Sequence, residues 1–316
     1  MTRDGQSASA SPGVVYIGGM LRSGTTLLCQ LLGNVDGCLA LGELRHCWGV
    51  LAANTPCACG RPVRECPVWS AAVREAVGPG ADPAFYEHSY ALANTVLRPG
   101  LALEAARRHA SPRVAEYRDL MVRLMRALAG VTGASYVVDA SKSATGALLW
   151  ASSRLPVHLV QIYRPPAAVA YSEARRVVWP DEVARYAPPS RTITKSALRW
   201  NAFNVSVSAV SRCADSYTLV RYEDLVSDPA GTLQEIVGKL PGFEDVVIDE
   251  VATSDRGHLV SGNPSFFERP VIREPDERWK RELTPREKAL ITALTAPVSA
   301  VLDTRRRRLA AHRGKS

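Results

Sequence analysis

Short continuous hydrophobic runs alternate along the chain with segments in which hydrophobic residues recur at helical spacing. The runs cover residues 14–17, 135–138, 157–163 and 217–220, and a further short run covers 38–41. Strands that are buried on both faces give such runs, and the helices between them connect neighbouring strands of a parallel sheet. The pattern predicts a three-layer α/β fold with a central parallel sheet and helices on both of its faces.

The stretch from about residue 50 to 130 departs from this alternation. Residues 52–67 are rich in Pro, Cys, Gly and Arg, which is typical of a loop, and residues 70–130 show helical spacing interrupted by Pro and Gly. The sequence predicts a helical insertion that shapes an acceptor pocket. We expect its aromatic side chains mainly to fill a core: Trp48, Trp69, Phe85, Tyr86 and Tyr90.

The pattern is that of one domain over residues 14–302. Residues 1–13 are small and polar without an apolar signal core, and are predicted to form a disordered lead. Residues 303–316 are predicted to form a basic tail that contains Arg305 to Arg308. No run reaches the roughly 18 apolar residues of a membrane span, so we expect no membrane partner and a cytoplasmic location.

The net charge of +8 and the isoelectric point of about 9.3 suit a chain that binds an anion. A nucleic-acid site would combine basic with aromatic residues, and no such interleaving occurs. We therefore expect an anionic small molecule rather than a nucleic acid.

A glycine-containing loop follows the first predicted strand and leads into a helix over residues 25–33. Glycines allow backbone amides to approach a ligand closely, and the helix N-terminus attracts anions, so the loop is predicted to cradle a phosphate. Gly19 and Gly24 keep the spacing of the ATP-binding loop, but Thr25 stands where that loop has its lysine. The cation lies inside the loop, at Arg22, which indicates a phosphate-bearing donor other than a Mg-bound triphosphate.

Other polar residues follow the ends of later strands. Ligands of parallel sheets bind at the carboxyl ends of the strands, so Arg22, Asp139, Arg164 and Tyr222 are expected at one edge. Ser172 lies eight residues after Arg164 and four before Arg176, and a hydroxyl between two guanidiniums suits a phosphate dianion. The sequence thus predicts a second phosphate site.

These motifs resemble those of bacterial sulfotransferases that use 3′-phosphoadenosine 5′-phosphosulfate (PAPS). The resemblance rests on the loop at residues 22–26, the Arg164/Ser172 pair and the stretch from Tyr222 to Leu225, and residues 258–264 are similar to a closing segment of bacterial members. It implies PAPS as the donor, with Arg164 and Ser172 on the 3′-phosphate and Tyr222 beside the adenine. Arg176 resembles a further arginine of the tyrosyl-protein branch. The loop residues implied at the 5′-phosphosulfate are Arg22, Ser23, Gly24, Thr25 and Thr26.

The same resemblance implies an in-line transfer of the sulfuryl group to a hydroxyl, without a required metal. Glu43 resembles the general base of the tyrosyl-protein branch, and Lys142 resembles a lysine that stabilises the transferring group, together with Arg22. A base role for Asp139 or a histidine remains an alternative. A small molecule, a glycan or a peptide could provide the hydroxyl, and nothing in the sequence indicates the oligomeric state.

A nucleoside-triphosphate enzyme, such as a small-molecule kinase, is the alternative function. Asp139, at a strand end, would then hold Mg²⁺. The missing loop lysine argues against this alternative.

Five of the seven cysteines lie between residues 38 and 66. A knuckle of Cys57, Cys59 and Cys66 could hold a structural zinc, with Cys47 or His46 as a fourth ligand. Disulfides and free thiols are the alternatives, and a reducing compartment favours thiols.

Overall fold

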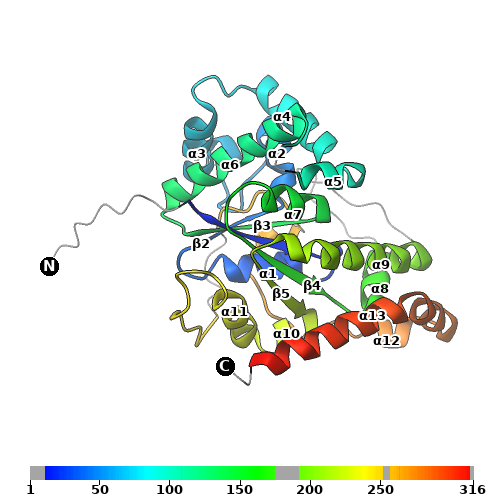
Figure 1. Cartoon of the computed structure of the whole chain (residues 1–316). Helices are drawn as coiled ribbons and strands as arrows, with labels where there is room; N and C mark the ends of the chain where they lie inside the picture. The colour runs from blue at the N-terminus through cyan, green and yellow to red at the C-terminus, as the bar shows by residue number, and fades with distance from the viewer. Residues whose placement is uncertain (1–10, 108, 175–191, 252–256, 263, 314–316) are drawn as a thin grey trace.

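The computed structural model describes residues 11–107, 109–174, 192–251, 257–262 and 264–313, and is built around a five-stranded parallel sheet (Figure 1). The strand order is β2-β3-β1-β4-β5. The predicted parallel sheet is confirmed, because each hydrophobic run forms one strand. The strands are β1 (Gly13–Gly18), β2 (Cys38–Gly42), β3 (Tyr136–Lys142), β4 (Val157–Tyr163) and β5 (Ser216–Arg221).

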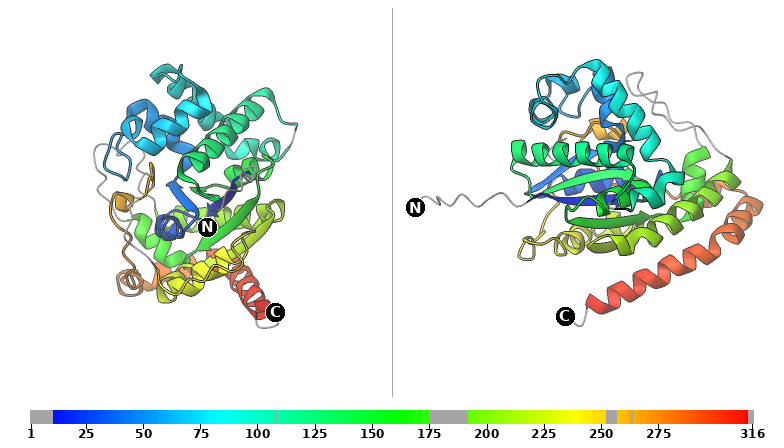
Figure 2. Two further views of the ribbon diagram at one scale, coloured as in Figure 1. Left: turned by 90° about the vertical axis from the view of Figure 1, so that its left-hand side faces the viewer. Right: turned by 45° about the horizontal axis from the view of Figure 1, so that its top comes forward.

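Helices cover both faces of the sheet, which gives three layers (Figures 1 and 2). Alternate residues of β1 separate into two hydrophobic clusters: Val14 and Tyr16 face one side, and Val15 and Ile17 face the other. The Val15 side packs against α1 (Thr25–Leu32) and α11 (Pro229–Val237). The Tyr16 side packs against α6 (Pro112–Thr132), α7 (Ala144–Ala151) and α9 (Ile193–Val210). The three-layer fold class is therefore confirmed.

The segment between β2 and β3 is helical, as predicted. It contains α2 (Cys47–Ala53), α3 (Pro67–Val77), α4 (Pro83–Val96), α5 (Ala102–Ala105) and α6. Trp48 and Trp69 are fully buried, and Trp48 packs against Phe85 and Tyr86, so these aromatic residues do fill a core. The insertion shares this core with β1, β2 and β3.

The other elements are four helices that follow β4 and short 3₁₀ turns spread along the chain. They are α8 (Pro166–Ala174), α10 (Tyr222–Ser227), α12 (Trp279–Glu282), α13 (Pro285–Arg313), and the short 3₁₀ turns η1 (Leu44–His46), η2 (Val63–Glu65), η3 (Pro99–Leu101), η5 (Ser211–Cys213) and η6 (Pro264–Phe267). Within the described part of the chain, no helix is both long and apolar enough to cross a bilayer.

Two predicted boundaries are wrong. Gly13 was assigned to the lead but belongs to β1, where it is buried and pairs with Tyr136; residues 1–10 of that lead lie outside the described residues. β3 does not end near Asp139 but continues to Lys142, because it lies between two strands and its pairing with β1 extends to Gly18 and Lys142.

The predicted basic tail is a helix as far as Arg313, so that prediction is also wrong over 303–313. The helix packs back on the domain through polar contacts. Arg305 stacks on the Tyr217 ring at 4.3 Å, Arg306 pairs with Asp224, and Tyr163 donates a hydrogen bond to Asp303 at 2.8 Å. These contacts explain why the arginine run is ordered.

Candidate active site

The loop between β1 and α1 packs tightly against Tyr222. Gly24 has φ +90°, and a Cβ built there would lie 2.4 Å from the Tyr222 ring, so only glycine fits. Gly24 is also the N-cap of α1, and the first turn of this helix has neither a side-chain cap nor an acidic residue. Ser23 is fully buried, and its hydroxyl has no partner among the described residues. A helix start of this kind, with an unsatisfied buried hydroxyl beside it, is suited to an anionic ligand.

Two guanidiniums and a hydroxyl meet beside this loop. Arg22 Nε donates a hydrogen bond to Ser172 Oγ (2.9 Å), although the two residues are 150 positions apart. The Arg164 guanidinium lies over the Tyr222 ring, 4.7 Å from its centroid, and donates to the Arg22 carbonyl at 3.5 Å. Arg22, Arg164, Ser172 and Tyr222 thus lie together at the carboxyl edge of the sheet, and we call them the arginine cluster.

The arginine cluster has an excess of positive charge. Burial lowers the pKa of Arg22, and the neighbouring Arg164 charge lowers it further. Neither arginine forms an ion pair within the described residues. Asp276 lies beside Arg164, whose Nη2 donates to the Asp276 carbonyl at 3.2 Å, but the Asp276 carboxylate is bonded to Arg278. Glu173, the acid that acts on Arg22, is already bonded to Arg199 and Ser196. The Arg164 Nε is buried and has no partner among the described residues. An anion would complete this arrangement.

A second pair of site residues, Glu43 and Lys142, forms a salt bridge. Lys142 ends β3 with φ +73°, and its carbonyl accepts a hydrogen bond from the Gly19 amide at 3.3 Å, so this pair adjoins the glycine loop. The Glu43 backbone is held from the other side, because its amide donates to the Ser261 carbonyl at 2.9 Å. The structure therefore brings Glu43 and Lys142 together beside the loop, across 99 positions of sequence.

The charge of Lys142 decides the ionisation of Glu43. Burial alone would raise the pKa of the carboxyl, but the Lys142 ammonium, with a contribution from His46, lowers it below its ordinary value. His46 Nε2 lies 3.9 Å from the second carboxylate oxygen. Glu43 is thus a carboxylate at neutral pH, which is the form a general base requires.

Asp139 is buried, and both of its carboxylate oxygens accept hydrogen bonds. One carboxylate oxygen accepts from the Leu44 amide (3.3 Å) and from the amide and hydroxyl of Ser141, and the other accepts from Trp150 Nε1 (2.8 Å). Burial raises the pKa of this carboxyl, and the hydrogen bonds oppose the rise. Asp139 therefore fixes the backbone next to Glu43, and its oxygens are directed at protein donors rather than at a metal or a substrate.

A family model described as "Sulfotransferase family" matches residues 12–241, which is most of the chain. The chain belongs to the sulfotransferase family. A comparison with curated proteins gave no significant match.

Three solved sulfotransferase structures are similar to this chain at low sequence identity. The sulfotransferase domain of the Synechococcus PCC 7002 olefin synthase is 18% identical, with 92% of this chain and 98% of that chain covered and a TM-score of 0.47. The sulfotransferase domain of the curacin biosynthetic pathway is 17% identical, with 92% and 99% covered and a TM-score of 0.49. Sulfotransferase STF1 from Mycobacterium tuberculosis H37Rv is 18% identical, with 72% and 67% covered and a TM-score of 0.37.

Family membership favours the sulfotransferase prediction over the kinase alternative.

Two other predicted residues lie at the start of α1. Thr25 is buried there, and the Thr26 hydroxyl lies 3.5 Å from the position that a Cβ on Gly262 would occupy. Arg176 lies outside the described residues. The link between Ser261 and Glu43 was missed because no local pattern marks a contact between segments so far apart.

The sulfotransferase does assemble the three predicted knuckle cysteines, but with a different fourth residue. The sulfurs of Cys57, Cys59 and Cys66 and a ring nitrogen of His258 lie within 4.8 Å of one another. The prediction of Cys47 or His46 as the fourth ligand is wrong, because Cys47 is buried in the core of the insertion and His46 faces Glu43. All seven cysteines are described, and none forms a disulfide.

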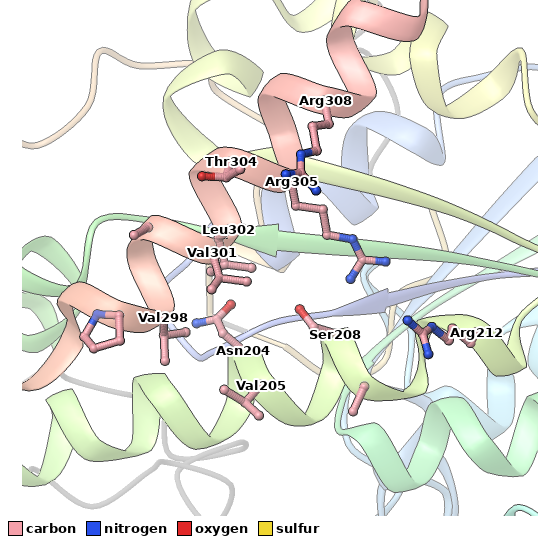
Figure 3. A pocket seen from close by; sticks show the side chains of 13 residues that line it. Asn204, Val205, Ser208, Arg212, Val298, Val301, Leu302, Thr304, Arg305 and Arg308 are labelled. Carbon is pink, nitrogen blue, oxygen red and sulfur yellow. The ribbon is translucent and has the colours of Figure 1, made fainter.

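A separate groove lies between α9 and α13, with a volume of about 1090 Å³ (Figure 3). Its walls include Val205 and Ser208 near the end of α9, Arg212 in the turn η5 that follows, and Val301 and Arg305 from α13 (Figure 3). The end of α9 leads into the start of β5, so this part of the groove lies toward the opposite edge of the sheet from the arginine cluster.

Proposed function

We propose that this sulfotransferase transfers the sulfuryl group of PAPS to a hydroxyl acceptor. The observation that carries the proposal is the arginine cluster, in which two partly or fully buried guanidiniums and a hydroxyl meet without an acidic partner beside a glycine loop. Two buried groups that lack partners among the described residues, Ser23 Oγ and Arg164 Nε, fit a ligand with phosphate oxygens. PAPS has two such anionic ends, the 3′-phosphate and the 5′-phosphosulfate.

We assign the 3′-phosphate to Arg164 and Ser172, with Arg176 as a further ligand on the strength of the resemblance. The hydrogen bond between Arg22 and Ser172 supports a bridging role for Arg22, with one side toward the 3′-phosphate and the other toward the loop. Tyr222 would line the adenine pocket, where Arg164 already stacks on its ring. The 5′-phosphosulfate would bind the loop, at Ser23, Gly24, Thr25 and Thr26, where the dipole of α1 adds attraction.

We assign the chemistry to Glu43 and Lys142. Glu43 accepts the proton of the acceptor hydroxyl as the new oxygen–sulfur bond forms and the bond from sulfur to the 5′-phosphate oxygen breaks. Lys142 turns from Glu43 toward the transferring group, and Arg22 and the loop amides stabilise the charge that grows on the leaving phosphate. The departure of Lys142 raises the basicity of Glu43, because the lysine is what holds its pKa down. The scheme needs no metal at the reacting atoms.

Three other features stay predictions. The acceptor could be a small molecule, a glycan or a peptide, and the helical insertion is the region that would select it. The cytoplasmic location and the division into a lead, one domain and a C-terminal segment rest on the sequence pattern.

A transfer assay tests the proposed function. The protein is incubated with a panel of hydroxyl acceptors and either ³⁵S-labelled PAPS or γ-³²P-labelled ATP with Mg²⁺. We expect label transfer from PAPS, with adenosine 3′,5′-bisphosphate formed in equal amount, and transfer at least about 100-fold slower by the Glu43→Gln protein. Phosphoryl transfer from ATP to the same panel, without transfer from PAPS, would contradict the proposal.

A further inference from the structure

Cys57, Cys59, Cys66 and His258 form a compact group outside the proposed catalytic machinery, which we call the cysteine–histidine cluster. The His258 Nδ1 lies 3.2 Å from the Cys66 sulfur and 3.9 Å from the Cys57 sulfur, and all four ligand atoms lie within 4.8 Å of one another. Cys57 and Cys66 are buried, whereas Cys59 is exposed. Within the described residues, this is the one group of three or more His, Cys, Asp or Glu side chains with such spacing.

The backbone holds both halves of the cluster in place. Gly60, with φ +88°, closes a tight turn after Cys59, in which its amide donates to the Cys57 carbonyl at 2.9 Å. Ala58 donates to the Leu259 carbonyl (2.9 Å), and Trp69 Nε1 donates to the His258 carbonyl (2.8 Å). Segments about 200 positions apart are therefore fastened together on either side of the four ligand atoms.

We propose that the cysteine–histidine cluster is a structural zinc site with Cys₃His coordination. Tetrahedral zinc binds sulfur at about 2.3 Å and nitrogen at about 2.0 Å, so neighbouring ligand atoms lie roughly 3.5–3.8 Å apart. The distances from His258 Nδ1 to the Cys66 and Cys57 sulfurs, 3.2 and 3.9 Å, bracket this spacing. Zn²⁺ displaces the three thiol protons and is closed off by four protein ligands, which is the mark of a structural site rather than a catalytic one.

The site would fix the position of Glu43 without touching it. Three residues after His258, the Ser261 carbonyl accepts the Glu43 amide at 2.9 Å, and Val260 donates to the Leu41 carbonyl at 3.1 Å. Zinc anchors the start of this segment to the insertion, so its loss would release the backbone that holds Glu43. His258 and the three cysteines are therefore positioning residues. The zinc site itself does not depend on the identity of the donor; only its effect on turnover rests on the proposed function.

Metal analysis of the purified protein tests the proposal directly. We expect about one zinc per chain after expression in zinc-supplemented medium, and retention through gel filtration. The Cys59→Ser protein, in which an exposed ligand is lost, should hold less than about one fifth of that amount. The matched control is Cys213→Ser, another exposed cysteine far from the cluster in sequence, which should keep its full zinc content. The His258→Cys protein should also keep zinc, because thiolate replaces imidazole as the fourth ligand.

Two further readouts do not depend on activity. Cobalt added to the apoprotein should give the visible absorption of tetrahedral thiolate coordination in the wild type and in Cys213→Ser, but not in Cys59→Ser. Removal of zinc with a chelator should lower the melting temperature of the wild type by at least about 5 °C and leave Cys59→Ser unchanged. Wild-type protein without stoichiometric zinc that also fails to bind cobalt would overturn the proposal, as would a disulfide among these cysteines in freshly purified protein.

Discussion

At the scale of single residues, two cations of the site have a left-handed backbone conformation, which residues other than glycine rarely adopt. Arg22 has φ +69° and Lys142 has φ +73°, and neither is a glycine. A left-handed conformation costs about 1–2 kcal/mol for such a residue and persists only where the surroundings impose it. Here the glycine loop and the end of β3 impose it. In these conformations Arg22 donates to Ser172 and Lys142 pairs with Glu43.

The Glu43→Gln substitution tests the proposed base. Glutamine keeps the size of the side chain but cannot accept a proton, so we expect turnover to fall by about 10²–10⁴-fold. Binding of adenosine 3′,5′-bisphosphate, measured by calorimetry, should stay nearly constant. Glu116→Gln, an exposed glutamate of the insertion, is the control. Equal loss of turnover and binding would make Glu43 a structural residue instead.

His158 on β4 gives a stability prediction that is independent of function. It lies between Ser216 and Thr218 of β5, and burial, together with the charge of Lys239, lowers its pKa to about 3. The unfolded histidine has a pKa of about 6.5. Between pH 6.5 and 3 the unfolded chain takes up a proton that the folded one does not, so stability falls as the pH falls, by up to about 1.4 kcal/mol per pH unit.

The measurement is chemical denaturation of the wild type and of His158→Gln between pH 7 and 5. The glutamine variant lacks the titrating group, so its stability should depend less steeply on pH, whatever its absolute value. Parallel curves for the two proteins would show that His158 is not a buried neutral histidine.

At the scale of elements, the segment around Ser261 lies alongside the end of β2. Gly42 has φ +78°, and a Cβ there would lie 2.1 Å from the Ser261 carbonyl oxygen. Gly42→Ala should therefore displace this segment together with the Glu43 backbone, and lower both stability and turnover. Gly133→Ala is a matched control, because Gly133 has φ +72° and no atom within 4 Å of the added carbon.

The control should cost only the backbone strain, about 1–2 kcal/mol, with turnover unchanged. Gly42→Ala should cost more and reduce turnover by at least about tenfold, since small displacements of a catalytic group are costly. Thermal denaturation measures the loss of stability of each variant, and initial-rate kinetics measure its loss of turnover. Equal effects on both properties would mean that the Ser261 contact does not position Glu43.

The packing of α13 is carried partly by polar and stacking contacts. Arg305 lies over Tyr217 and donates a hydrogen bond to Ser211 Oγ at 2.9 Å, whereas Arg307 is bonded only to the Asp303 carbonyl of its own helix in the described contacts. Arg305→Ala should lower the free energy of unfolding by about 1–2 kcal/mol. Arg307→Ala should change it by less than about 0.5 kcal/mol. Urea denaturation compares the two, and equal losses would mean that the Tyr217 contact adds no stability.

At the scale of the whole molecule, the order of strands and helices could be predicted because each strand is one continuous hydrophobic run. The helical insertion was predictable for a similar reason, since its Pro and Gly breaks separate segments with helical spacing. Local chemistry also indicated the glycine loop. Each of these features depends on residues that lie close together in the sequence, so a local pattern is enough to predict it.

Contacts between distant segments could not be predicted in this way. His258 reaches cysteines about 200 positions away, and the length of β3 depends on the strands on either side of it. Arg305 and Arg306 have the composition of a solvated tail, but their partners, Tyr217 and Asp224, come from β5 and α10. The three-dimensional fold decides these features, and they include the proposed zinc site.

The most direct test of the central claim is a calorimetric titration with adenosine 3′,5′-bisphosphate, without metal, for the wild type and for Arg164→Ala. ATP with Mg²⁺ is the comparison ligand. A charged hydrogen bond contributes about 1.5–3 kcal/mol, so we expect Arg164→Ala to weaken bisphosphate binding by about 10–100-fold and to change ATP binding little. Tighter binding of ATP with Mg²⁺ than of the bisphosphate, or equal loss of both ligands in the variant, would contradict the assignment of the donor.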